Sequence, residues 1–141
     1  MPEVSSFEAA CLSGAGGAVS AFIRLDEPKF RPILIAPPKN WNAKWLGKKK
    51  RGIANIPILV TGVMKSNHAD ARAFAQMALD YNVDINEAYP DAGGMSLFMM
   101  FCALGHSDAC HIIMDAKDAG KIELDWHFFD EHNRNIVWYA A

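Results

Sequence analysis

The chain has 141 residues, 51% of them apolar, and a net charge of −2, so it can bury one ordinary hydrophobic core and is not generally disordered. Its apolar runs, such as residues 95–104, are shorter than the roughly 20 residues that cross a bilayer. The N-terminus lacks a basic region followed by an apolar stretch. We therefore expect a single soluble domain, 1–141, without a transmembrane segment and located in the cytoplasm.

Charge is distributed unevenly along the chain. Between Pro28 and Ala69 there are nine Lys or Arg residues and no Asp or Glu, whereas the rest of the chain carries five basic and sixteen acidic residues. This pattern predicts a positive segment joined to an acidic body. The segment is suited to an anionic partner, or equally to the protein's own acidic surface.

A proline-rich segment at about 26–52 contains most of this basic charge, and its four prolines deny it a long helix. It also carries two tryptophans and a basic run, and we take these as candidate partner-binding residues: Trp41, Trp45, Lys48, Lys49, Lys50 and Arg51. Such residues can stack on nucleic-acid bases, settle at an anionic membrane surface or form a nuclear localisation signal. In the alternative interpretation, the tryptophans pack onto the domain and the lysines face water.

Two short antiparallel helices are predicted between residues 96 and 114. Ser96 is a suitable N-cap for an apolar run that continues without a helix breaker to Gly105, a residue that commonly ends a helix in the left-handed conformation. Asp108 then places a negative charge at the start of a second helix, whose apolar residues between 109 and 113 have helical spacing.

The stretch from Gly94 to Met114 resembles an ankyrin repeat, whose pattern is Gly-x-Thr-Pro-Leu-His-x-Ala-Ala-x-x-Gly-His followed by an acidic residue and an aliphatic helix. The residues in register with this pattern are Gly94, Ser96, Cys102, Gly105 and His106. Residues 84–86, Asp-Ile-Asn, resemble the Asp-Val-Asn that closes the preceding repeat, and Leu124-Asp125 resembles the same feature. Met99 stands where the family has His.

The resemblance extends over most of the chain. Residues 5–14 and 18–23 fit a first repeat, and residues 56–58 open a second, with helices expected at 59–66 and 70–81. The opening of a last repeat lies at 133–141, and Asn133 follows Gly94 by 39 positions, against a family spacing of about 33.

The fold class that this resemblance implies is all-α: a short ankyrin-like helical solenoid with long inter-repeat loops, interrupted by the basic insertion at about 26–52. The alternative is another all-helical domain built from amphipathic helix pairs. A sheet-based fold is disfavoured, because only residues 32–36 and 56–61 form β-branched runs.

Ankyrin repeats bind partners through projecting loops and inner helices, so the resemblance implies a non-catalytic module that binds another protein. Tyr89, Phe128 and Phe129 are the aromatic candidates for contact at the loop tips, although either Phe can instead cover the core. Binding of nucleic acid or anionic lipid through the insertion is the alternative. An enzyme or metal protein that uses His127, Asp130 and His132 is less favoured, and we expect no cofactor and no metal.

Two further features concern exposed and buried groups. Residues 136–139, Ile-Val-Trp-Tyr, would form an apolar C-terminal edge, which favours self-association or a truncated array.

The cysteines Cys11, Cys102 and Cys110 lie among apolar residues without metal-ligand spacing and are expected to be core thiols.

Overall fold

The computed structural model describes residues 4–36, 56–89, 92–125, 130 and 132–135. Within these ranges it contains seven α-helices, no strand, and one isolated antiparallel bridge between Tyr89 and Met95. The prediction of an all-α fold is confirmed. Among the described helices, none has the length and apolar character needed to span a bilayer.

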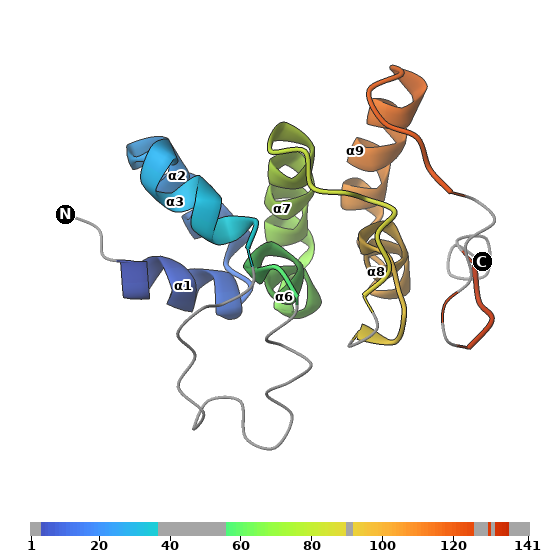
Figure 1. Cartoon of the computed structure of the whole chain (residues 1–141), viewed down its shortest axis with the longest axis horizontal. Helices are drawn as coiled ribbons and strands as arrows, with labels where there is room; N and C mark the ends of the chain where they lie inside the picture. Colours follow the sequence, from blue (N-terminus) through green and yellow to red (C-terminus); the bar gives the residue numbers. More distant parts are fainter. Residues whose placement is uncertain (1–3, 37–55, 90–91, 126–129, 131, 136–141) are drawn as a thin grey trace.

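Six of the helices form three consecutive pairs, each joined by a short turn. The pairs are α1 (Val4–Leu12) with α2 (Gly16–Leu25), α6 (Ile58–Lys65) with α7 (His68–Asp80), and α8 (Leu97–Ala103) with α9 (Ser107–Asp118). Figure 1 shows them side by side, with α1, α6 and α8 in one row and α2, α7 and α9 in the other. The central helix α7 contacts both α2 and α9, so it joins the three pairs into one body.

The second and third pairs repeat at a fixed spacing in the sequence. Helix α8 begins 39 residues after α6, at 97 against 58, and α9 begins 39 residues after α7, at 107 against 68. Gly94 and Asn133, also 39 positions apart, both have positive φ angles of 73° and 58°. A left-handed backbone position therefore recurs together with the helices.

The predicted boundaries of α8 are confirmed, whereas α9 continues to Asp118, four residues beyond the predicted end at Met114. The Ser96 hydroxyl accepts a hydrogen bond from the Met99 amide at 3.3 Å, and Gly105 follows α8 with a φ of +73°. The second pair has an equivalent cap that sequence reasoning missed, because the Asn67 side chain accepts from the Asp70 amide at 2.8 Å. As a result α7 starts at His68, two residues earlier than expected.

The predicted insertion does not begin at residue 26. Helix α3 (Glu27–Leu34) occupies its first part, with one proline in its first turn and Pro32 inside it. Phe30 and Leu34 on this helix are fully buried, and the Phe30 ring stacks on Phe7 of α1 with centroids 4.6 Å apart. Burial of these side chains offsets the hydrogen bond that Pro32 removes, so α3 belongs to the core.

The core is closely packed around Phe74 of α7, where two other helices have a glycine. A Cβ atom added at Gly62 of α6 would lie 2.6 Å from Phe74 Cζ and 2.7 Å from the backbone oxygen of Cys11. A Cβ atom added at Gly16 of α2 would collide with the backbone oxygen of Asp70 and lie 3.0 Å from Phe74 Cδ2. Both helices therefore need glycine to reach α7.

We expect Gly62→Ala to lower the free energy of unfolding by about 1–3 kcal/mol, because the α1 backbone must move to admit the methyl group. Gly17→Ala is the matched control, since its added Cβ would lie 3.5 Å from the nearest atom, Asp70 Oδ1. Alanine should there be neutral or stabilising in the helix. Urea unfolding followed by circular dichroism measures both, and equal stability of the two variants would contradict this packing.

Candidate binding surface

The first helices of the second and third pairs are buried over most of their length, and their exposed residues lie at their C-terminal ends. All six residues of α6 from Ile58 to Val63 are buried, as are all five of α8 from Leu97 to Phe101. A helix that is apolar on every side lies inside a protein. The surface available for binding, within the described residues, is thus on the second helices and the loops.

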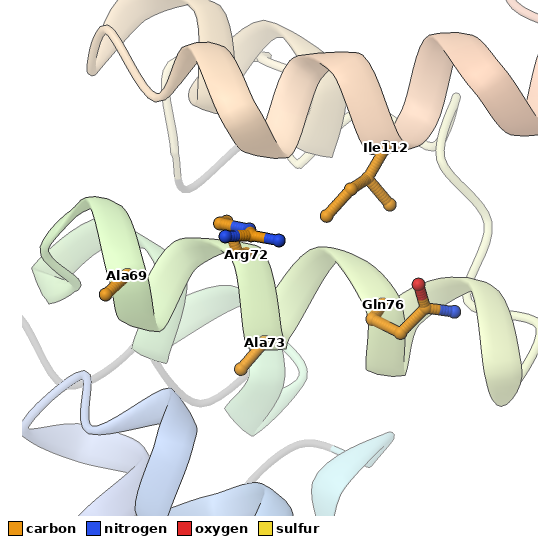
Figure 2. Close-up of a pocket in the computed structure, with 5 residues that line it drawn as sticks. All are labelled: Ala69, Arg72, Ala73, Gln76 and Ile112. Carbon is orange, nitrogen blue, oxygen red and sulfur yellow. The ribbon is translucent and has the colours of Figure 1, made fainter.

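A groove of about 310 Å³ lies between the two second helices α7 and α9. Figure 2 shows the side chains that line it: Ala69, Arg72, Ala73 and Gln76 from α7, and Ile112 from α9. The two alanines leave room because they are small, and Ile112 supplies an apolar wall. Ala73 and Ile112 are 39 positions apart, so the groove joins equivalent positions of two successive pairs.

The groove is apolar inside and polar at its rim. Arg72 and Gln76 are both exposed, and the Gln76 amide nitrogen donates to Asp80 Oδ1 at 2.9 Å. A guanidinium beside an apolar recess is chemically suited to an aliphatic side chain next to a carboxylate. Sequence reasoning missed this groove, although the Ala69–Ala73 spacing on one helix face was a readable signal.

The loops that follow α7 and α9 are joined through Asn86. Its side-chain nitrogen donates to the Glu123 carbonyl at 2.8 Å, and its side-chain oxygen accepts from the Asp125 amide at 2.9 Å. The Asp84 carboxylate in turn accepts from the Asn86 amide at 2.9 Å. Asn86 and Asp125 are 39 positions apart, so the side chain of one loop bonds the equivalent position of the next.

Tyr89 is not exposed at a loop tip. Its side chain is only 3% exposed, and its amide donates to the Met95 carbonyl at 3.1 Å. Burial, with smaller contributions from Glu87 and Asp84, raises the pKa of its hydroxyl above the ordinary value. A buried ring stabilises the loop, and it is not presented to a partner in this structure.

The other predicted contact residues lie outside the described residues. These are the tryptophans and basic run of the insertion, Trp41, Trp45, Lys48, Lys49, Lys50 and Arg51, the loop pair Phe128 and Phe129, and the apolar edge at 136–139.

Asp130, a member of the less favoured metal site, has a structural role in its loop. Its buried carboxylate accepts hydrogen bonds from the amides of His132 and Arg134, and from Arg134 Nε at 3.1 Å. These bonds hold a turn in which Asn133 is left-handed. In the part of the chain that the structure describes, no three His, Cys, Asp or Glu side chains gather as metal ligands do.

Two histidines meet where the second and third pairs join. The Nδ1 atoms of His68, at the start of α7, and His106, before α9, are 2.9 Å apart. One ring must donate and the other accept, so the bond requires at least one neutral ring. His106 is 5% exposed, and burial followed by the charge of His68 lowers its pKa, against an opposing effect of the Ser66 backbone.

Comparison with known proteins gives no assignment for this surface. No family model matches the chain, and no curated protein and no solved structure matches it. We therefore infer the function from the residues of this surface.

We expect acid to destabilise the fold through His106. Because its folded-state pKa is below the unfolded value of about 6.5, the unfolded chain binds the proton first as pH falls. The stability associated with neutral His106 is complete above about pH 6.5 and is lost as pH falls through the lower folded pKa. Urea midpoints between pH 7.5 and 5 measure this, with His106→Asn as the control that cannot titrate; equal pH dependence in both proteins would refute it.

Asn86→Ala should lower the free energy of unfolding by about 1–2 kcal/mol, since it removes two exposed inter-loop hydrogen bonds. Glu87→Ala, at the exposed neighbouring position, is the matched control and should change stability by less than about 0.5 kcal/mol. Hydrogen exchange of the Asp125 amide gives a local readout. Unchanged protection of that amide in Asn86→Ala would show that the two loops are held by other contacts.

Proposed function

We propose that the chain is a non-catalytic protein-binding module of the ankyrin-repeat type, working in the cytoplasm. The observation that carries the proposal is the 39-residue register, in which the helix starts, one left-handed position and one loop position recur from one pair to the next. Stacked helix pairs with long connecting loops form a modular scaffold for binding and need no reactive centre. The Ser96 cap and Gly105 turn add support, because they fall at the positions where the repeat pattern has them.

In this proposal the partner contacts the α7–α9 groove and not the first helices. The first helices of the ankyrin pattern usually contribute to a concave binding surface, but α6 and α8 are buried here. The groove offers an apolar recess with Arg72 at its rim. We therefore expect the partner to insert an aliphatic side chain flanked by an acidic residue.

A crosslinking experiment tests this function. A photo-reactive amino acid at Ala69, on the groove, should give a discrete protein adduct in cell extract that unlabelled wild-type chain competes away. The same group at Ala21, an exposed residue of α2, is the control and should not give that adduct. The partner identified by mass spectrometry is then purified and titrated against wild type and Arg72→Glu.

Arg72→Glu should weaken binding of the purified partner by about tenfold or more, because it replaces an attractive charge with a repulsive one. Arg24→Glu makes the same charge change at an exposed position of α2 and should bind as wild type does. A partner that binds both variants equally would place its contact elsewhere, and the absence of any saturable protein adduct would overturn the proposal.

The charge asymmetry of the sequence favours a second candidate, binding of nucleic acid or anionic lipid through Trp41, Trp45 and the basic run 48–51. Nine basic residues and no acidic ones occur between Pro28 and Ala69. This candidate expects affinity for single-stranded DNA or phosphatidylserine vesicles that falls steeply with added salt. Changing Lys48, Lys49, Lys50 and Arg51 together to Glu should abolish it, whereas Arg72→Glu should leave it largely intact.

A further inference from the structure

Two thiols face each other across the third helix pair. The Sγ atoms of Cys102, near the end of α8, and Cys110, in the first turns of α9, are 3.6 Å apart. Both residues are free thiols, and both are partly exposed. The sulfurs need to approach by only about 1.5 Å to reach the bond length of about 2.05 Å in a disulfide.

The surroundings make the two sulfurs chemically unequal. Cys110 is the fourth residue of α9, where the positive end of the helix dipole favours a thiolate. Either thiol can donate in the contact between the two sulfurs. The start of α9 favours the arrangement in which Cys102 donates, which lowers the pKa of Cys110 and raises that of Cys102. Cys110 is therefore the nucleophile of the pair, and Cys102 holds the proton.

We propose that Cys102 and Cys110 form a two-cysteine redox site that reacts with hydroperoxides and closes reversibly into a disulfide between α8 and α9. This site is independent of the proposed partner binding, because it rests on the two thiols and their surroundings and not on the α7–α9 groove. Figure 1 shows α8 and α9 as the pair at the right of the array, next to α7.

The reaction takes place in two balanced steps. The Cys110 thiolate attacks the terminal oxygen of the hydroperoxide, the O–O bond breaks, and the product alkoxide takes a proton to leave as an alcohol, or as water from hydrogen peroxide. Cys110 is then a sulfenic acid. Cys102, after losing its proton, attacks the Cys110 sulfur; the S–O bond breaks and hydroxide leaves as water. The two thiols are oxidised by two electrons and the peroxide is reduced by two.

The third cysteine provides an internal control. Cys11 is fully buried in α1, and burial together with Glu8 raises its pKa to about 12. A buried thiol with so little thiolate reacts slowly. Oxidation should therefore spare Cys11 and consume the other two thiols together.

Intact-mass spectrometry on the reduced full chain tests the proposal. With a small excess of hydrogen peroxide near pH 7.5, the chain should lose about 2 Da, the two hydrogens removed when a disulfide forms. N-ethylmaleimide, added after unfolding, should then label one of the three cysteines, and peptide mapping should identify it as Cys11. Dithiothreitol should restore labelling of all three.

Serine variants assign the two roles. In Cys102→Ser, Cys110 should accumulate as a sulfenic acid that dimedone traps, because the second thiol is missing. In Cys110→Ser, loss of the Cys102 thiol should be about tenfold slower or more, because the remaining thiol lacks the helix start that stabilises the Cys110 thiolate and burial still raises its pKa. Cys11→Ser should form the disulfide as wild type does. Circular dichroism confirms that each variant is folded.

Several outcomes would overturn the proposal. One is a wild-type chain that keeps three alkylatable thiols under peroxide. Another is oxidation of Cys110 to a sulfinic acid while Cys102 stays free. A disulfide that involves Cys11, or that joins two chains, would likewise show that the 3.6 Å pair is not the reactive unit.

Discussion

The rest of the structure depends on how closely the backbones of α2 and α6 approach Phe74. This ring is fully buried in the central helix, and glycines at 16 and 62 leave the space that it fills. Protein interiors are packed as densely as organic crystals, so side chains at both glycines would force the outer helices away. The same contact therefore fixes two interfaces of α7 at once.

That central position of α7 determines where a partner can bind. Because α7 packs on α2 and α6 on its inner side, its opposite side faces α9, and the groove forms along that junction. Phe74 and Ala71 point into the core, whereas Arg72 and Gln76 on the same helix are exposed. Because the buried residues fix the orientation of α7, they also determine which of its side chains are exposed for binding.

The sequence predicted the local structure of the third pair well, because its determinants are local. Ser96 can only satisfy free amides of the turn that follows it, and Gly105 marks a helix end by its backbone freedom alone. Helix α3 was missed for the opposite reason. Its prolines argue against a helix locally, and the burial of Phe30 against Phe7 that stabilises it depends on a distant segment.

The candidate site was less predictable than the fold, because exposure is a property of the assembled chain. Tyr89 is of a residue type that is common in interfaces, yet the bridge to Met95 closes its loop and the ring is buried. The sequence did not identify Arg72 as a contact residue, since a single arginine on a helix is usually solvated. Only the pairing of α7 with α9 places it at the rim of a groove.

The chemistry of the described residues is concentrated at the turn between α8 and α9. Cys102, His106 and Cys110 follow one another at intervals of four residues across this turn. In the repeat pattern that this stretch resembles, the position of Cys102 carries alanine, a side chain of similar bulk without a reactive group. A thiol there leaves the packing of the pair nearly unchanged, but it places a sulfur against Cys110 at the start of α9. The tight turn that Gly105 permits is what holds the two helix ends together, so the same backbone feature that ends α8 also brings the two thiols into contact.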